Sequence, residues 1–371
     1  MTAGPRTDVG TVEDLHASAT RITGLDDFGD EDYRQGLRKL LLAYAETAAL
    51  TPVGSKATRG LVRGALVSRL LSEAAWRQYP EHAGVRIERP VFITGLPRTG
   101  TTTLHRLLTA DPAHQGLELW LTEAPQPRPP RWEWADHPVY AVLSAAYRRH
   151  TALDGVHHLG PDQIEECWRL LCQSMTSVSF ECTAYIPDYA DWLAGNDWTA
   201  AYRRHRRNLR LIGMADRGRR WILKNPSHLF ALDALLAVYP DAVVVRTHRD
   251  PAAAIASVCS LNARAAEGWS AGFRGALLGR SQLALWSRGE RAFRAARARH
   301  DAGRFIDVDY RDFAADPLRV VGRIYDRLGT PLSGTARAAM EKHLSGTPKP
   351  AHEYDLASFG LTDTDVAAAM E

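Results

Sequence analysis

Apolar residues recur every three or four positions through residues 26–80, and this spacing predicts amphipathic helices. Two such runs, YRQGLRKLLLAYAETAAL and RGLVRGALVSRLLSEAAWRQY, are separated by a segment that contains Pro52 and Gly54. Because proline and glycine interrupt regular structure, we expect a helix on each side of this segment. The pattern predicts an N-terminal helical extension over residues 1–88.

After residue 89 the pattern changes to short apolar runs that alternate with helical segments. The runs PVFIT at 90–94, WILK at 221–224, AVVVRTH at 242–248 and RFIDVDY at 304–310 have the β-branched and aromatic residues of strands. Helical patterns such as LFALDALLAVY lie between them. Such alternation is typical of a parallel sheet covered by helices on both faces. Residues 89–371 are therefore predicted to form an α/β domain.

Composition and charge exclude some classes of protein. The chain has 371 residues, of which 45% are hydrophobic and 24% charged, as in globular proteins. Its 46 Lys and Arg residues against 43 Asp and Glu residues give a net charge of +3, too small for the basic face of a nonspecific nucleic-acid-binding protein. The arginine-rich segment 202–220 is interpreted as a solvated, salt-bridged helix face. We expect no nucleic-acid partner.

The sequence carries no signal for a membrane or a secretory route. No stretch is apolar enough for an integral membrane segment, and the N-terminus MTAGPRTDVGTVEDLH lacks the features of a signal peptide. We therefore expect a cytoplasmic protein. The cysteines are too few for a disulfide scaffold and match no zinc signature, so we expect reduced, mostly buried thiols. They are Cys167, Cys172, Cys182 and Cys259.

A first candidate for chemistry is the loop GLPRTGTT at residues 95–102, between a predicted strand and a helix. Backbone N–H groups in such a loop can bind an anion. The glycine spacing matches the nucleoside-triphosphate loop GxxxxGK[ST], but Thr101 replaces its lysine and the positive charge lies at Arg98. Because that lysine reaches the terminal phosphates, its absence argues against ordinary ATP or GTP hydrolysis and favours a shorter anionic chain such as a phosphosulfate.

A second candidate is Arg249, at the end of the predicted strand AVVVRTH, with Ser257 eight residues later in a helix. Open α/β sheets bind ligands at the carboxyl ends of their strands, and a guanidinium group binds phosphate through two hydrogen bonds. The spacing lets the hydroxyl of Ser257 share the ligand-facing side of its helix. The alternative is a surface ion pair of Arg249 with Asp250 or Asp241.

These two blocks resemble motifs of the sulfotransferase family, whose members use 3′-phosphoadenosine 5′-phosphosulfate (PAPS) as donor. The segment PVFITGLPRTGTTTLHRLLTADP resembles the 5′-phosphosulfate loop, and residues 97–102 match its core P-[KR]-[ST]-G-T-T. The segment VVVRTHRDPAAAIASVCS resembles the 3′-phosphate motif through Arg249 and Ser257. The resemblance runs from about residue 22 to the end of the chain, and the segments outside the two motifs look like those of a bacterial single-chain branch of the family.

The resemblance implies a P-loop-type parallel sheet flanked by helices, no metal, and transfer of a sulfuryl group to a hydroxyl group or, less often, to an amine. It also implies a donor site in which Arg249 and Ser257 hold the 3′-phosphate. The residues expected to hold the 5′-phosphosulfate are Arg98, Thr99, Gly100, Thr101 and Thr102. We expect the insertion at about 118–200, with its many tryptophans, to line the pocket of a small-molecule or lipid-like acceptor.

Three residues are candidates for catalysis. Lys224 ends a predicted strand, where its ammonium group could reach the transferring group, and His228 follows at a predicted helix start. The resemblance supports both, although three residues separate them where cytosolic members of the family usually have one. Glu166, in a predicted helix after Pro161, is the rival general base, since apolar neighbours would raise its pKa.

Other interpretations remain open at this stage. A P-loop kinase would need Mg²⁺ and a carboxylate at a strand end, for which Asp307 and Asp309 are the candidates. A catalytically silent nucleotide-binding module would bind donor without turnover. Near the C-terminus a late loop could fold over the donor, and a homo-oligomer is compatible with the sequence. The candidate residues of that loop are Lys349, His352 and Tyr354.

Overall fold

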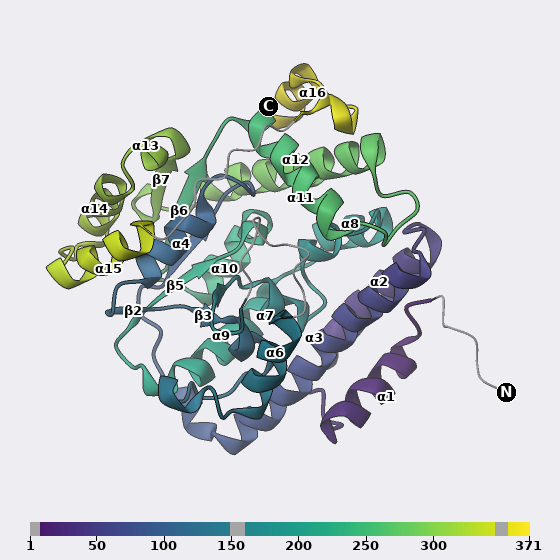
Figure 1. Ribbon diagram of the computed structural model, residues 1–371, viewed down its shortest axis with the longest axis horizontal. Helices are drawn as coiled ribbons and strands as arrows, with labels where there is room; N and C mark the ends of the chain where they lie inside the picture. The colour runs from purple at the N-terminus through teal and green to yellow at the C-terminus, as the bar shows by residue number, and fades with distance from the viewer. Residues whose placement is uncertain (1–7, 149–159, 346–354) are drawn as a thin grey trace.

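Five parallel strands form the centre of the fold, in the order β2-β5-β1-β6-β7 (Figure 1). The computed structural model describes residues 8–148, 160–345 and 355–371. The strands are β1 Val91–Thr94, β2 His114–Gln115, β5 Arg220–Lys224, β6 Val243–His248 and β7 Phe305–Asp309. All but β2 were predicted from the sequence, and the α/β class with a parallel sheet is confirmed.

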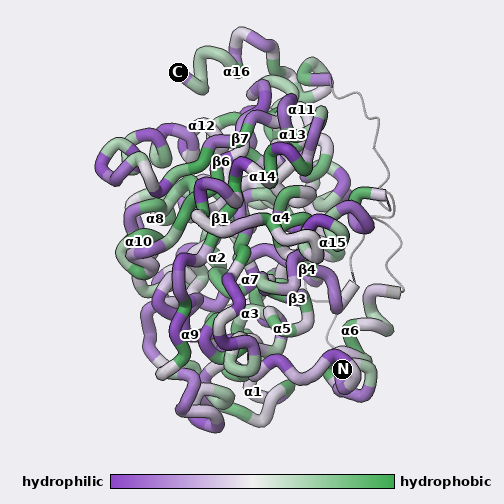
Figure 2. The backbone as a smooth tube through the Cα atoms, turned by 90° about the vertical axis from the view of Figure 1, so that its left-hand side faces the viewer, coloured by the Kyte–Doolittle hydropathy of each residue, from purple (hydrophilic) through white to green (hydrophobic). Residues whose placement is uncertain are grey.

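Side chains of the central strands alternate between two apolar clusters, one on each face of the sheet. In β1, Val91 and Ile93 belong to one cluster, and Phe92 belongs to the other. The first face is covered by α4 Thr101–Thr109, α14 Pro317–Leu328 and α15 Gly334–Ser345. The second is covered by α9 Thr199–Ile212, α10 Leu232–Val238 and α12 Gly275–Arg297. Figure 2 shows the hydrophobic colours concentrated around these strands.

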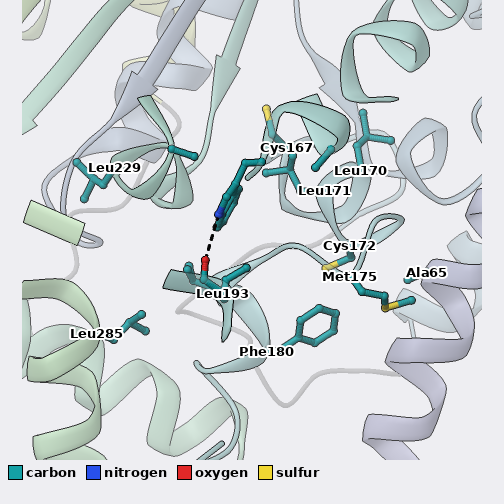
Figure 3. Packing of buried hydrophobic residues seen from close by; sticks show 14 of the residues in the cluster. Ala65, Cys167, Leu170, Leu171, Cys172, Met175, Phe180, Leu193, Leu229 and Leu285 are labelled. Carbon is teal, nitrogen blue, oxygen red and sulfur yellow. Dashed lines mark hydrogen bonds between the residues drawn. The ribbon is translucent and has the colours of Figure 1, made fainter. Parts of the chain in front are cut away.

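The N-terminal extension is helical, as the sequence predicts. It contains α1 Val12–Thr23, α2 Arg34–Glu46 and α3 Pro52–Gln78. The break between α2 and α3 arises because Pro52 is the first residue of α3 and the hydroxyl of Thr51 accepts a hydrogen bond from the N–H of Gly54 at 3.0 Å. These helices share the larger apolar cluster with the sheet, and Figure 3 shows Ala65 of α3 in that cluster. The division of the chain at residue 89 therefore stays a prediction.

A buried polar network joins α3 to α9. Arg69 is fully buried and donates to the carbonyl oxygens of Phe28 at 2.7 Å and Gln173 at 3.1 Å. Arg204 of α9 is also buried, and it donates to Gln173 Oε1 at 2.9 Å and to Glu73 at 2.7 Å. The prediction of a solvated, salt-bridged face agrees with the exposed Arg203 and Arg217, but it is wrong for Arg204, which belongs to this core network.

The segment between β2 and β5 also differs from its prediction. A continuous helix after Pro161 was wrong, because β4 Ile164–Glu165 pairs antiparallel with β3 Leu117–Glu118 and is followed by the short helix α7 Trp168–Cys172. Trp120, Trp134 and Trp198 are buried in the core and cannot wall an open pocket. The other helices are α5 Leu119–Glu123, α6 Pro138–Arg148, α8 Pro187–Ala194, α11 Pro251–Ala265, α13 Tyr310–Ala315 and α16 Asp363–Met370.

All four cysteines are free thiols, and three of them are buried, as the sequence predicts. Among the helices of the described ranges, none combines the length and the apolar character that crossing a membrane would require.

Candidate active site

The loop after β1 is shaped by two glycines. Gly95 has φ 142°, and a Cβ atom there would lie 2.5 Å from the carbonyl oxygen of Thr247. Gly100, directly before α4, has φ 87°, and a Cβ atom there would lie 3.1 Å from the ring of Tyr310. Between them Arg98 has φ 69°, an uncommon conformation for a residue with a side chain. The loop therefore turns sharply between β1 and α4, and its backbone lies at the start of α4.

Threonine hydroxyls fasten this loop to the ends of neighbouring strands. Thr99 is buried, donates to the carbonyl oxygen of Leu96 at 2.7 Å and shares a hydrogen bond with the hydroxyl of Thr247 at 2.5 Å. Thr102 accepts a hydrogen bond from Lys224 Nζ at 3.2 Å. Thr101 is buried at the first position of α4. The side chain of Thr99 therefore supports the loop, and Thr102 connects it to β5.

The structure brings together the residues predicted to bind the two ends of an anionic donor. Arg98 Nε donates to Ser257 Oγ at 3.0 Å, and Arg249 Nη1 donates to the carbonyl oxygen of Arg98 at 2.8 Å. Ser257 lies in α11, which begins after Asp250, whose side chain accepts from the N–H of Ala253 at 2.8 Å. No ion pair of Arg249 with Asp250 or Asp241 occurs among the described residues, so the alternative role of Arg249 is not supported.

Sequence analysis missed Tyr310. Its ring lies against the guanidinium group of Arg249, with 4.5 Å between the ring centre and Cζ. The same ring lies beside Gly100. An aromatic ring stabilises a cation above its face and limits its rotamers. Tyr310 directly follows β7, so it reaches the same sheet edge as Arg249. Its place as the last residue of the predicted strand RFIDVDY was the signal that could have identified it.

Lys224 and Glu166 form an ion pair at the end of β5. Lys224 is 2% exposed, and its ammonium group donates to Glu166 and to Thr102. Because an ammonium group has three hydrogens, one remains for a further acceptor. The N–H of Cys167 donates to the carbonyl oxygen of Lys224 at 3.0 Å, which holds Glu166 beside the strand end. Burial raises the pKa of Glu166, and the nearby ammonium group of Lys224 opposes that rise.

His228 lies elsewhere, inside the core. Its side chain is 1% exposed, Nδ1 bonds to the hydroxyl of Tyr202 at 2.7 Å, and its ring packs edge-on against Phe92 at 5.1 Å between centres. Burial lowers the pKa of His228 well below its usual value, which makes the imidazole a weak base. Among the described residues no hydrogen bond joins His228 to Lys224, Glu166 or the loop. This position argues against the expectation that His228 takes the acceptor proton.

A stability measurement checks this placement. We expect His228→Ala to lower the free energy of unfolding by about 3 kcal/mol, because it opens a cavity in the core and leaves the hydroxyl of Tyr202 unpaired. Tyr202→Phe keeps the ring and removes only the hydrogen bond, so its loss should be nearer 1 kcal/mol. Denaturant unfolding measures both, and wild-type stability of His228→Ala would contradict the placement.

The carboxylates proposed for a metal-dependent kinase are engaged by other groups. Asp307 pairs with His248 and with Arg297, each at 2.7 Å, and these partners hold the pKa of Asp307 well below its usual range. Asp309 accepts a hydrogen bond from the N–H of Arg311 at 2.7 Å and thereby begins α13. Among the described residues no group of three or more His, Cys, Asp or Glu side chains could hold a metal ion.

The C-terminal candidates Lys349, His352 and Tyr354 lie outside the described residues. The site is therefore built from the ends of β1, β5, β6 and β7 and from the segment between β4 and α7. Fold and site together define an α/β protein that presents an anion-binding loop, two arginines and a lysine–glutamate pair at the carboxyl edge of a parallel sheet.

Comparison with known proteins identifies the family. Residues 90–334 match the profile of the sulfotransferase family, and the chain belongs to that family. The crystal structure of sulfotransferase STF1 from Mycobacterium tuberculosis is 54% identical, with a TM-score of 0.93 over 98% of this chain and 99% of that one. Sulfotransferase STF9 from Mycobacterium avium is 27% identical, with a TM-score of 0.87 over 100% of this chain and 96% of that one.

Curated relatives come from Mycobacterium bovis and Mycobacterium tuberculosis. Both carry the name omega-hydroxy-beta-dihydromenaquinone-9 sulfotransferase and are 29% identical over 252 residues, or 65% of this chain. This chain spans 62% of the length of these relatives.

Proposed function

We propose that this chain transfers a sulfuryl group from PAPS to a hydroxyl group of a small-molecule or lipid-like acceptor by in-line displacement. The observation that carries the proposal is that the Arg98, Arg249 and Ser257 group and the Lys224–Glu166 pair lie at one edge of one parallel sheet. Family membership supports the same chemistry.

The residues fit a donor with two anionic ends. The two glycines let the loop at 95–100 pack against Thr247 and Tyr310 at the strand ends, so that its backbone lies at the start of α4, where N–H groups can bind an anion. Lys224 donates a hydrogen bond to Thr102 in the first turn of that helix. Arg249, backed by the ring of Tyr310, supplies a planar guanidinium group for the 3′-phosphate. When bound, PAPS supplies the sulfuryl group, and the chain binds, orients and neutralises its charge.

Glu166 is the proposed general base. Its carboxylate is held next to the ammonium group of Lys224. Because 24% of the side-chain surface of Glu166 is exposed, an acceptor hydroxyl can approach it. A carboxylate with a raised pKa accepts a proton more readily near neutral pH than an ordinary one. Lys224 keeps one hydrogen for an oxygen of the donor, so the two residues divide the roles of charge stabilisation and proton transfer.

The acceptor is proposed at the level of a hydroxyl group on an apolar molecule. The curated relatives are named for an omega-hydroxylated menaquinone derivative, which is such a molecule. Screening alcohols of increasing apolar length with labelled donor, and scoring product formation, tests this part of the proposal. Transfer only to amines would contradict it.

Ligand stabilisation tests the donor. We expect 3′,5′-adenosine bisphosphate to raise the melting temperature, since a ligand that binds only the folded chain adds about 2.7 kcal/mol at a hundredfold excess over Kd. ATP with Mg²⁺ serves as the comparison. Stabilisation by ATP with Mg²⁺ and none by the bisphosphate would contradict the proposal and favour a kinase. Binding without turnover of labelled donor on any hydroxyl acceptor would favour a silent binding module.

Arg249→Ala tests how the 3′-phosphate is held. We expect this variant to weaken binding of the bisphosphate by about 2–5 kcal/mol, because a phosphate loses its paired guanidinium. Adenosine 5′-phosphosulfate, which lacks the 3′-phosphate, should bind the variant and the wild type equally. Arg264→Ala, which removes an exposed arginine from the end of α11, is the control. Equal losses of affinity for the bisphosphate and for adenosine 5′-phosphosulfate would show that Arg249 does not recognise the 3′-phosphate.

A further inference from the structure

A cavity of about 840 Å³ lies at the opposite edge of the sheet from the candidate active site. Its walls include Arg89, which precedes β1, Arg220, the first residue of β5, and Asp241, which precedes β6. Strands that run parallel have all their amino ends at one edge. Arg220 and Lys224 are the two ends of β5, about 13 Å apart at the rise of a strand. The cavity is therefore separate from the donor site.

The cavity carries an excess of positive charge. Its carboxylates are Glu88, Asp111 and Asp241, and its arginines are Arg86, Arg89, Arg217, Arg219 and Arg220. Two of the carboxylates bond to uncharged groups, since Asp241 accepts from the backbone N–H of Arg89 at 2.6 Å and Asp111 accepts from the hydroxyl of Tyr325 at 2.5 Å. Within the described residues only one of these arginines forms an ion pair, Arg219 with Asp216 at 3.0 Å.

Two residues of the wall have a buried polar atom without a partner. Arg220 Nη1 and Thr330 Oγ1 are both shielded from solvent, and neither has a hydrogen-bond partner in the described part of the chain. An unpaired buried polar atom destabilises the folded chain, so native proteins seldom keep one without a reason. Burial and the neighbouring guanidinium group of Arg89 also lower the pKa of Arg220. An anion in the cavity would satisfy donors that the chain leaves unsatisfied.

The backbone of Arg89 is strained at this place. Its φ of 43° lies in the left-handed region, which is unfavourable for a residue with a side chain. The backbone N–H of Arg89 donates to the carboxylate of Asp241, and the Nη1 atom of Arg89 donates to the carbonyl oxygen of Leu328 at 3.1 Å. Strained residues cluster at ligand sites, where they fix donor groups in advance. This observation is independent of the charge and of the unpaired atoms.

We propose that this cavity binds a small anion with two or more negative charges on phosphate groups. Arginine forks match phosphate oxygens through paired hydrogen bonds, and the hydroxyls of Thr330 and Ser333 add neutral donors. At least two negative charges are expected on the ligand because the five arginines of the lining outnumber its three carboxylates by two. The volume admits a phosphorylated metabolite larger than inorganic phosphate.

Calorimetric titration with inorganic pyrophosphate tests the site. The full chain is first saturated with 3′,5′-adenosine bisphosphate, so that the donor site is filled. Wild type should then bind pyrophosphate at one saturable site, and Arg220→Met should bind it at least about tenfold more weakly because the guanidinium fork is lost. Arg203→Met, which removes an exposed arginine near the start of α9 that does not line the cavity, should bind like the wild type.

Arg86→Met is a second variant that distinguishes loss of the binding site from loss of folding. Arg86 is exposed at the rim of the cavity, so its loss should weaken pyrophosphate binding without unfolding the chain. Absence of saturable binding to wild type, or equal affinity in all four proteins, would overturn the proposal. This comparison among the variants does not depend on the proposed function. If the bisphosphate does not bind, the preceding titration with the bisphosphate shows this for all four proteins alike.

Discussion

Glu166→Gln is expected to lower turnover by roughly 10²- to 10⁴-fold while leaving the affinity for 3′,5′-adenosine bisphosphate nearly unchanged. The amide keeps the size of the carboxylate and can still accept a hydrogen bond from Lys224, but it cannot take a proton. General-base catalysis acts in the transition state, so kcat should fall and donor binding should not. Initial rates with labelled donor and an aliphatic alcohol measure the effect.

Glu165→Gln is the matched control. Glu165 is adjacent in sequence and accepts hydrogen bonds from the N–H of Glu166 at 2.7 Å and from the indole of Trp168 at 3.3 Å. The amide oxygen can accept the same two bonds, so we expect a turnover close to that of wild type. If Glu165→Gln lost as much activity as Glu166→Gln, the effect would come from the geometry of this segment and not from proton transfer.

The pH profile gives a second measure of the same role. The general base must be ionised, so the rate should rise with pH through the pKa of Glu166 and then level off. Burial raises the pKa of Glu166. The increase in rate should therefore be centred at a pH above 4.5, the ordinary pKa of a glutamate. A rise centred at or below the ordinary value would contradict the assignment, and Glu166→Gln should abolish this limb of the profile.

Much of the fold followed from the sequence because its signals are local. The apolar runs of β1, β5, β6 and β7 and the helices between them have periods that a single chain reveals. The two-residue strand β2 was missed, since so short a segment has no period of its own. The predicted helix after Pro161 failed for a related reason: pairing of β3 with β4, a tertiary contact, overrides the helical pattern there.

The site was predictable in part. Arg98, Arg249 and Ser257 belong to motifs that lie at strand ends, and the sheet brings those ends together. The burial of His228 could not be predicted, because it depends on Tyr202, which lies 26 residues earlier in α9. The pairing of Glu166 with Lys224 spans 58 residues and has no counterpart in any local pattern. Contacts of this kind follow only from the folded chain.

Lys224→Met is expected to lower turnover by roughly 10²- to 10³-fold, because a preorganised cation at the transferring group stabilises charge that develops in the transition state. Methionine keeps the length and volume of the buried stem, so packing at the end of β5 should survive. Lys56→Met, which removes an exposed lysine of α3, should keep wild-type turnover. Initial rates at saturating donor measure both variants.

The same substitution should move the pH profile in a defined direction. The ammonium group of Lys224 opposes the rise in the pKa of Glu166, so its removal should raise that pKa further and shift the rising limb to higher pH. A shift to lower pH would contradict the coupling between the two residues.

The double variant Lys224→Met with Glu166→Gln separates catalysis from stability. Lys224→Met alone leaves a partly buried carboxylate without its cation, which should lower the free energy of unfolding until the carboxylate is protonated. Removing both charges should restore much of that stability in denaturant unfolding, while turnover stays at the level of Glu166→Gln or below. Recovery of turnover together with stability would show that the pair is structural, since a catalytic pair cannot be replaced by two uncharged side chains.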